Sequence, residues 1–317
     1  MQAKTKDGLC FSIPYLFKGY KFIRFLGSGI TSLVCIVEDL HSGNFFSAKI
    51  IPKKYIQSTN LLNQINNEIS IMKNANHPNI VKFHDSFEYV NEINEHFIVI
   101  IMEYCENGNL YNFLIKYGFQ NENQKKTIIK GFLEAIKYLH DKGITHGDIK
   151  PENILLDSNF NAKLTDFGFS KTEIISGNES KSGTLYYAAP ELFVKGQYNS
   201  LKTDIWSIGI LIYCLSEKKL PFLKGNNDFI KKQITEGQLY FDPKINETLK
   251  KVVNRCTQLN ANKRPSIHEL IKDDYFCDND KTNDYLIQDN IDLFSNEDFQ
   301  PSYIYGIRSN CNHQILV

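Results

Sequence analysis

The fold-deciding stretch of this sequence is His146-Gly147-Asp148-Ile149-Lys150-Pro151-Glu152-Asn153, which is followed by Thr165-Asp166-Phe167-Gly168. Asp166 and Asn153 carry the carboxylate and amide oxygens that Mg²⁺ prefers as ligands. Asp148 can orient a hydroxyl group and accept its proton. Lys150 lies two residues beyond Asp148, on the same side of an extended segment, where it can steady a moving phosphate. The stretch therefore predicts a site that holds a metal-bound triphosphate against a hydroxyl group.

The size and charge of the chain limit the kinds of partner that it takes. Its 317 residues suit two packed lobes or one large domain, and a 42% hydrophobic content is enough to bury a sizeable core. Lys+Arg and Asp+Glu both number 36, so the formal net charge is zero. No global field then attracts nucleic acid or an anionic membrane, and we expect no nucleic-acid partner.

The cysteines and apolar runs predict an intracellular protein. The seven cysteines are odd in number and form no C-x-x-C pair, which favours reduced thiols in the cytoplasm or nucleus and gives no zinc-ligand cluster. No apolar run follows a basic start at the N-terminus, so no signal peptide is visible. The longest apolar stretch, residues 205–215, is too short to span a bilayer.

A glycine-containing turn joins the first two predicted strands, residues 20–26 and 33–38. The turn reads Gly27-Ser28-Gly29-Ile30-Thr31-Ser32, and a strand rather than a helix follows it. This order argues against a dinucleotide-binding fingerprint, which requires a helix next. It suits a flap whose glycines let backbone N–H groups approach phosphate oxygens. Taken alone, such a loop is roughly as often a plain hairpin turn.

Lys49 lies inside an apolar predicted strand, residues 45–51. One interpretation is an edge lysine whose ammonium group extends to water. The alternative is a phosphate ligand with a carboxylate partner, because an unpaired buried ammonium group is costly. Glu68 can be that partner, since it lies on the apolar stripe of a helix predicted over residues 61–72.

The rest of the chain divides into strands and then helices. Residues 81–87 and 96–102 read as strands joined by a polar loop over residues 88–95. Residues 103–108 read as a hinge whose backbone can hydrogen-bond an adenine edge. Helices are then predicted over residues 109–115, 121–141 and 203–215. We expect an α+β protein: a lead-in over residues 1–19, poorly ordered over residues 1–18, then a domain over 20–276 and a tail over 277–317.

Over about residues 20–276 the chain resembles a eukaryotic-type serine/threonine protein kinase. The resemblance is carried by His146-Gly147-Asp148 through Asn153, by Asp166-Phe167-Gly168 and by Ala189-Pro190-Glu191. It implies a bilobal fold, with a small antiparallel sheet and one major helix in the N-lobe (about 20–104). The C-lobe (about 105–276) is then larger and mainly helical.

The resemblance also implies the cofactors and the role of each site residue. ATP and Mg²⁺ are the implied cofactors, Asp148 the catalytic base, and Asn153 and Asp166 the metal ligands. Lys49, paired with Glu68, holds the non-transferred phosphates, and Lys150 assists the transfer. The residues implied around the nucleotide are Leu26, Gly27, Ser28, Gly29, Val34, Ala48 (against the adenine), Lys49, Glu68, Met102 (the gatekeeper), Glu103 and Cys105 (the hinge), Asn109 and Leu155.

Further implied contacts lie around the catalytic loop. Asp204 anchors the loop, Glu191 pairs with Arg264, and the apolar stack contains Met72, His146 and Phe167. Lys150 and Gly183-Thr184 resemble the serine/threonine version of the family, so serine and threonine hydroxyl groups of proteins are the implied substrates. Residues 188–222 resemble the calmodulin-dependent group, and most of all its AMP-activated and microtubule-affinity-regulating branch.

The chain departs from the family pattern at Gly147, where relatives carry an arginine that pairs with an activation-loop phosphate. Ser180 aligns with the usual phosphorylated position and Thr184 is nearby, so an upstream kinase acting on either is implied. Because the arginine is missing, our hypothesis is partial or no dependence on that phosphorylation. Ser32 replaces the third glycine of the flap, and Asn109 stands where relatives often carry a glutamate.

Two other functions are alternatives to an active protein kinase. A catalytically inactive, kinase-like scaffold would be expected to lack Lys49, Asp148, Asn153 or Asp166, and all are present. A small-molecule phosphotransferase would lack the peptide platform that Gly183-Thr184 and residues 189–191 form. For the tail, a plain disordered end is favoured over a docking or autoinhibitory segment.

Overall fold

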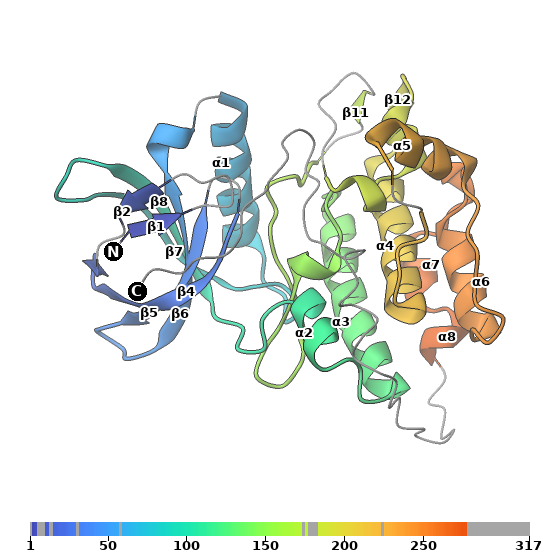
Figure 1. The fold of residues 1–317 in the computed structure, drawn as a ribbon, viewed down its shortest axis with the longest axis horizontal. Helices are drawn as coiled ribbons and strands as arrows, with labels where there is room; N and C mark the ends of the chain where they lie inside the picture. Colours follow the sequence, from blue (N-terminus) through green and yellow to red (C-terminus); the bar gives the residue numbers. More distant parts are fainter. Residues whose placement is uncertain are drawn as a thin grey trace. The chain divides into compact units, whose positions relative to one another are not determined.

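The computed structural model describes residues 2–4, 10–12, 15–29, 32–56, 59–172, 175–176, 183–222 and 225–277. These residues divide into two compact units (Figure 1). The first unit contains the described residues up to Asn76 together with Val81–Cys105. The second contains His77–Ile80 and the described residues from Glu106 onward.

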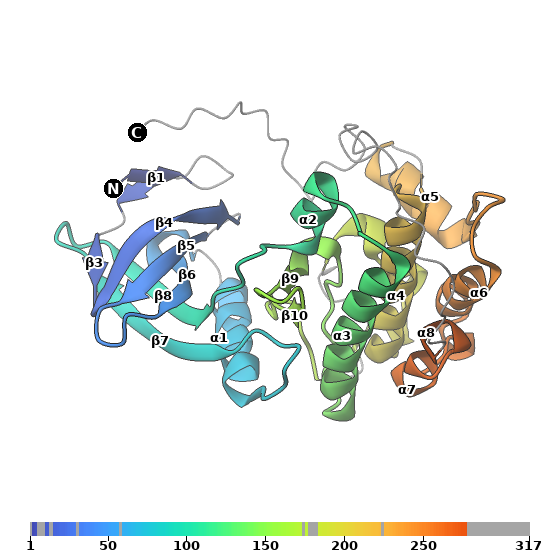
Figure 2. The same ribbon diagram turned by 90° about the horizontal axis from the view of Figure 1, so that it is seen from below.

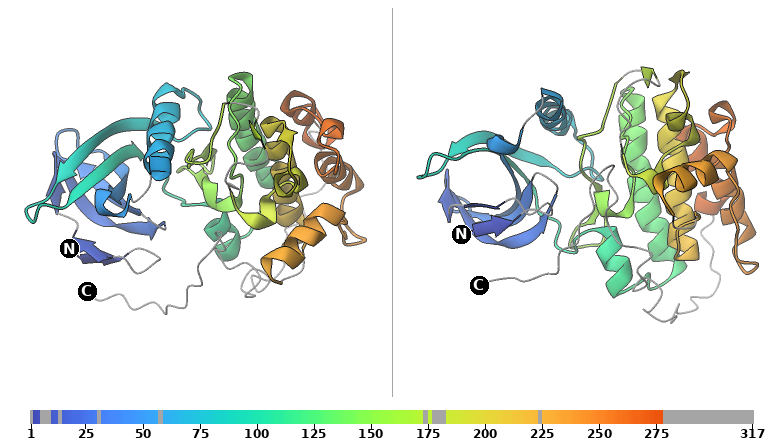
Figure 3. Two further views of the ribbon diagram at one scale, coloured as in Figure 1. Left: turned by 90° about the horizontal axis from the view of Figure 1, so that it is seen from above. Right: turned by 45° about the horizontal axis from the view of Figure 1, so that its top comes forward.

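The first unit is built on a six-stranded antiparallel sheet with the order β3-β4-β5-β6-β8-β7 (Figure 2). Its strands are β3 (Leu16–Phe17), β4 (Tyr20–Ser28), β5 (Leu33–Asp39), β6 (Phe45–Pro52), β7 (Phe83–Val90) and β8 (His96–Glu103). Register shifts in β4 at Phe22/Arg24 and Phe25/Gly27 add local twist. The sheet is strongly curled, as Figure 3 shows. A short hairpin of β1 (Gln2–Lys4) and β2 (Cys10–Ser12) stands apart from this sheet.

One face of the sheet encloses an apolar core. Because side chains alternate along a strand, Phe46, Ala48 and Ile50 of β6 share a face. Ala48 and Ile50 are buried in this core, Phe46 packs against it, and the other buried members are Phe17, Tyr20, Phe22, Leu33, Cys35, Val37, Phe87, Phe97, Val99 and Ile101. Ser47 and Lys49, which alternate with these residues of β6, face the opposite side.

The strands differ from the predicted ones at two places. Residues 1–18 were expected to be a poorly ordered lead-in, but Leu16–Phe17 pairs with β4 and the Phe17 side chain is only 2% exposed. Residues 88–95 were expected to be a loop that follows a strand over residues 81–87. The observed strand β7 begins and ends later, at Phe83 and Val90. Val81 is fully buried yet precedes β7, because an apolar residue can fill a core from irregular backbone.

The second unit is mainly helical, with α4 at the centre of its core. Its helices are α2 (Leu110–Lys116), α3 (Glu122–Asp141), α4 (Ser200–Glu217), α5 (Asn227–Glu236), α6 (Glu247–Cys256), α7 (Ile267–Ile271) and α8 (Asp274–Cys277). Asparagine side chains cap the N-termini of α2 to α6, where an acceptor satisfies an unpaired backbone N–H. Apolar residues at helical spacing on α3 are all buried: Ile128, Ile129, Phe132, Ile136 and Leu139.

Two short antiparallel strand pairs lie between α3 and α4. β9 (Ile154–Leu156) pairs with β10 (Ala162–Leu164), and β11 (Ile175–Ser176) pairs with β12 (Gln197–Tyr198). The loop of residues 142–153 lies between α3 and β9, and Asp166 follows the end of β10 after one residue, Thr165. Among the described residues, none of the helices combines the length and the apolar character needed to cross a membrane.

Candidate active site

Asp148 is the centre of a polar cluster in the second unit. Its side chain is buried, and Oδ1 accepts hydrogen bonds from both the backbone N–H and the hydroxyl group of Thr184, each at 2.9 Å. Oδ2 accepts from Lys150 Nζ at 2.6 Å and from Asn153 Nδ2 at 3.1 Å. Residues 148, 150 and 153 therefore meet as their spacing predicted. Thr184 joins them from a segment 36 residues away.

The ammonium group of Lys150 is held in its charged form. Burial alone would lower the pKa of Lys150, but the carboxylate of Asp148, with smaller contributions from Glu152 and Asp166, raises it overall. Lys150 Nζ also donates to Thr184 Oγ1 at 2.8 Å. A permanent positive charge thus lies beside Asp148, where it can stabilise negative charge that develops on a transferred group.

Asn153 is oriented by two contacts of its amide nitrogen. Nδ2 donates to the backbone carbonyl of Asp148 at 2.8 Å as well as to its carboxylate. The amide oxygen consequently points away from these contacts, and oxygen is the end of the amide that binds hard cations. The backbone carbonyl of Asn153 accepts from Thr165 N–H at 3.0 Å, which brings the residue before Asp166 beside Asn153.

Asp166 has a left-handed backbone with φ +65°. Few residues other than glycine adopt this conformation, and it concentrates at functional sites because the surrounding structure must enforce it. The next residue, Phe167, is fully buried and its ring packs edge-on against His146 at 5.5 Å between ring centres. His146 Nε2 lies 3.0 Å from the carbonyl oxygen of Thr165. The contacts of Thr165 and Phe167, on the two sides of Asp166, thus hold its backbone in this conformation.

Asp204 of α4 anchors the loop that carries Asp148, as the resemblance implied. Its carboxylate accepts the backbone N–H groups of His146 at 2.8 Å and of Gly147 at 3.0 Å. His140 Nε2 of α3 lies 2.9 Å from the same carboxylate, a contact that sequence reasoning missed. The available signal in the sequence was that His140 lies on a predicted helix only a few residues before His146. Because Asp204 is itself buried, it sets the loop from inside the core.

Lys49 and Glu68 form the predicted ion pair within the first unit. Lys49 Nζ donates to both carboxylate oxygens of Glu68, at 2.7 and 2.8 Å. Glu68 lies on α1 (Thr59–Asn74) with a side chain that is only 5% exposed. The interpretation of Lys49 as an edge lysine extending to water is therefore wrong. The pair holds the ammonium group in one place on the sheet surface.

The strand register shows which residues share a face of the sheet with Lys49, and it corrects the prediction made for Ala48. Lys49 lies opposite Val34 on β5, and Gly27 on β4 lies opposite Val34 in turn. Ala48 was expected to pack on an adenine, but it points to the other face, where it is fully buried in the apolar core. Ser47 shares the face of Lys49 and lies opposite Met102 on β8. Ser47 thus replaces Ala48 among the candidate residues.

The glycine turn closes on itself between β4 and β5. Gly29 N–H donates to the Ser32 carbonyl oxygen at 2.8 Å, while Ser28 and Leu33 are the last paired residues. A Cβ atom at Gly29 would lie 2.8 Å from Ser32 Oγ, a contact that rotation of the serine side chain can relieve. Leu26 is exposed on β4. Ile30 and Thr31 lie outside the described residues.

The predicted hinge residues divide between the two units. Glu103 ends β8, and its backbone N–H donates to the Lys82 carbonyl oxygen at 2.9 Å. This N–H is therefore already hydrogen-bonded within the first unit. Cys105 is buried at the end of the first unit. Asn109 in the second unit caps α2, since its side chain accepts from Asn112 N–H at 2.8 Å. Leu155 on β9 forms a backbone bridge with Asn109.

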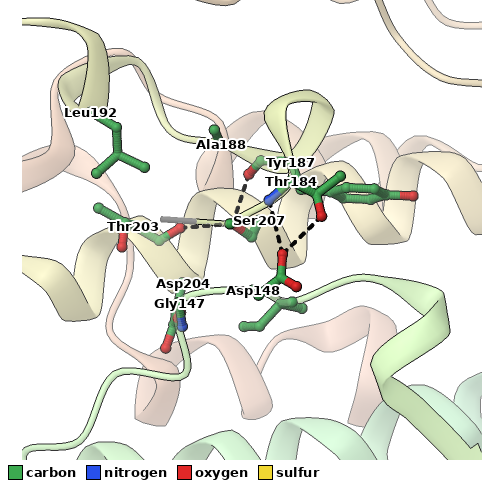
Figure 4. Close-up of a pocket in the computed structure, with 11 residues that line it drawn as sticks. Gly147, Asp148, Thr184, Tyr187, Ala188, Leu192, Thr203, Asp204 and Ser207 are labelled. Carbon is green, nitrogen blue, oxygen red and sulfur yellow. Dashed lines mark hydrogen bonds between the residues drawn. The ribbon is translucent and has the colours of Figure 1, made fainter. Parts of the chain in front are cut away.

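A small cavity borders Asp148 in the second unit (Figure 4). Ala188, Leu192, Thr203 and Ser207 also line it, and Ser207 Oγ donates to the Tyr187 carbonyl oxygen at 2.7 Å. The hydroxyl group of Thr184 points toward the Asp148 carboxylate in this view. Ser180, the other candidate for modification, lies outside the described residues.

The donor set fits a cation that takes part of its coordination from a ligand. Among the described residues, no group of three His, Cys, Asp or Glu side chains could hold a metal ion alone. Asn153 and Asp166 offer an amide and a carboxylate oxygen, which suits Mg²⁺ because it usually keeps waters and phosphate oxygens as its other ligands.

Comparison with known proteins gives consistent similarities. A family model described as "Protein kinase domain" matches residues 20–276. The serine/threonine-protein kinase cds1 of Schizosaccharomyces pombe is 34% identical over 273 residues, which cover 81% of this chain and 58% of the relative. CBL-interacting protein kinases 32 and 33 of Oryza sativa are each 30% identical over 261 residues, 81% of this chain and 58% and 56% of those relatives. The chain thus spans less than two thirds of the length of these curated relatives.

Proposed function

Because the chain belongs to the protein kinase family, we propose that it transfers the γ-phosphate of ATP to serine and threonine hydroxyl groups of proteins. The observation that carries this proposal is the contact set of Asp148, whose carboxylate meets Lys150, Asn153 and Thr184. Members of this family use ATP and Mg²⁺ and act on proteins. Residues 188–222 resemble the calmodulin-dependent group of this family, which supports placing the chain in that group.

The roles of the residues in the second unit follow from their contacts. Asp148 accepts the proton of the substrate hydroxyl group, and Lys150 stabilises charge on the transferred phosphoryl group. Asn153 and Asp166 hold Mg²⁺, which neutralises the phosphate oxygens when it is bound. Thr184, tied to both Asp148 and Lys150, keeps the base in place.

In the first unit, we assign the nucleotide contacts to one face of the sheet. Lys49 holds the non-transferred phosphates and Glu68 fixes its position. Gly27, Ser28, Gly29, Val34, Ser47 and Met102 provide the remaining surface, together with Leu26, Glu103 and Cys105. Asn109 and Leu155 are the residues of the second unit that we propose to contact the nucleotide.

A position for regulation follows from the contacts of Thr184. Its hydroxyl group is engaged by Asp148 and Lys150, so a phosphate there would place negative charge beside the base. We therefore propose Ser180 rather than Thr184 as the position for an upstream kinase. The free thiols of Cys35, Cys214 and Cys256 support a reducing compartment, the cytoplasm or nucleus.

Peptide phosphorylation tests the proposed function. The purified chain is incubated with Mg-ATP and an array of peptides that carry serine, threonine or tyrosine, and incorporated phosphate is measured. We expect transfer to serine and threonine peptides that disappears when Mg²⁺ is chelated. A folded protein that phosphorylates none of them would favour a scaffold, and transfer to small molecules alone would favour a different phosphotransferase.

Replacing Lys49 with methionine is expected to lower kcat/KM for ATP by about 10²-fold or more, since a fixed charge on the phosphates is lost. Lys54→Met is the matched control, because Lys54 pairs with Glu95 on the surface of the same unit and is 43% exposed. This control should stay within about twofold of wild type, as exposed ion pairs contribute little. Steady-state kinetics with varied ATP measure both. Equal losses in the two variants would contradict the role of Lys49.

A further inference from the structure

Gly147 lies where the catalytic loop meets the segment that follows Asp166. Its backbone is left-handed, with φ +82°. A Cβ atom at this position would lie 2.7 Å from the carbonyl oxygen of Phe169 and 3.4 Å from the carbonyl carbon. Real Cβ atoms essentially never approach an oxygen this closely. The two backbones are therefore in contact because residue 147 has no side chain.

The Phe169 carbonyl is held in place on its C-terminal side. Thr145 N–H donates to the Lys171 carbonyl oxygen at 2.8 Å, and Lys171 N–H donates back to Thr145 at 3.1 Å. Ser170 Oγ donates to the His146 carbonyl oxygen at 3.2 Å. These hydrogen bonds lie beside the contact in both segments, so the Phe169 carbonyl cannot move away from Gly147 without breaking them. Ser170 N–H, in the same peptide group as this carbonyl, donates to the Phe167 carbonyl oxygen at 3.0 Å, so a displacement of the peptide is passed on to the segment that carries Asp166.

Gly147 is equally confined on its other sides. Its N–H donates to the buried Asp204 carboxylate at 3.0 Å. Its carbonyl oxygen would lie 2.6 Å from a Cβ atom at Gly183, so these two backbones are also in close contact. The residue after Gly183 is Thr184, which bonds the Asp148 carboxylate. A shift of Gly147 therefore reaches Asp148 on one side and Asp166 on the other.

We propose that Gly147 is a positioning residue whose missing side chain sets the spacing between the loop that carries Asp148 and the segment that carries Asp166. This inference rests on the proposed kinase activity, in which the first residue is the base and the second binds Mg²⁺. The glycine in place of arginine thus has a second consequence besides the lost phosphate contact: it allows the two backbones to pack closely. With the backbone spacing of this chain, a Cβ atom at residue 147 is expected to displace the metal ligand relative to the base.

The test compares Gly147→Ala with Gly143→Ala. Gly143 also has a left-handed backbone, with φ +69°, but nothing lies within 4 Å of a Cβ atom there. Both variants thus share the conformational cost, and only the first introduces the contact. For Gly147→Ala we expect kcat to fall by about 10²-fold, as for a displacement of about 1 Å. We also expect the Mg²⁺ concentration for half-maximal rate to rise severalfold, whereas Gly143→Ala should match wild type in both.

A second variant separates strain from contact. Asparagine tolerates the left-handed conformation better than alanine but carries the same Cβ atom. Gly147→Asn should therefore lose kcat and Mg²⁺ affinity as Gly147→Ala does, and wild-type kinetics in either variant would overturn the inference. If neither variant folds while Gly143→Ala does, as judged by circular dichroism, the role is structural and the inference is also overturned. An inactive but folded wild-type chain would instead refute the proposed function.

Discussion

Replacing Asp148 with asparagine is expected to lower kcat by about 10²- to 10⁴-fold, the range that a positioned general base contributes. The amide has nearly the same shape as the carboxylate, so the side chain still fills its buried position. It no longer accepts a proton from the substrate hydroxyl group, and it no longer balances the charge of Lys150 Nζ at 2.6 Å. The nucleotide contacts assigned to Lys49 are unchanged. ATP binding should consequently persist while turnover is lost.

The measurement is kcat at saturating Mg-ATP and peptide, with ATP binding followed separately by calorimetry. Asp157→Asn is the matched control in the same unit. Asp157 Oδ1 accepts from Asn159 and Asn161 N–H groups, both at 2.9 Å, so it organises an exposed turn. This control should retain kcat within about twofold, as expected for a surface substitution. A value of kcat for Asp148→Asn within about tenfold of wild type would contradict the assignment of the base.

The local part of the site could be predicted because its residues are close in the chain. Asp148, Lys150 and Asn153 lie within one short loop, so their offsets alone bring them together. The Lys49–Glu68 pair was predictable for a different reason: each residue interrupts an otherwise apolar pattern, and a buried charge requires a partner. The sequence pattern was therefore sufficient where a buried charged group had only one available partner.

The prediction for Ala48 was wrong because it followed the residue type rather than the strand geometry. Alternation along β6 places Ser47 and Lys49 on one face and Ala48 on the other. This geometry was available from the sequence once the strand was recognised. The contact between Gly147 and Phe169 was not available, because it depends on how closely two backbones approach in the folded chain. The start of β7 was also missed, since Val81 is buried without belonging to a strand.

The largest expected effect on stability comes from replacing Arg264 with methionine. The Arg264 side chain is fully buried, and its guanidinium group donates to Glu191 Oε1 at 2.6 Å and Oε2 at 2.7 Å. It also donates to the carbonyl oxygens of Lys202 and Gln258, both at 2.8 Å, and lies 5.1 Å from the ring centre of Trp206. Methionine fills much of the volume but leaves a carboxylate and two carbonyl groups without their donor. Removing one partner of a buried pair costs about 3–5 kcal/mol, and we expect a loss of this size.

Arg255→Met is the matched control, because Arg255 pairs with Asp273 while its own side chain is 48% exposed. Its free energy of unfolding should stay within about 1 kcal/mol of wild type. Trp206 is the sole tryptophan of the sequence and lies against Arg264, so its fluorescence during urea unfolding reports on this region directly. The double variant with Glu191→Gln tests the cause, because the second substitution should cost much less once the guanidinium group is gone. Additive losses would show that Arg264 acts through its carbonyl and tryptophan contacts instead of the ion pair.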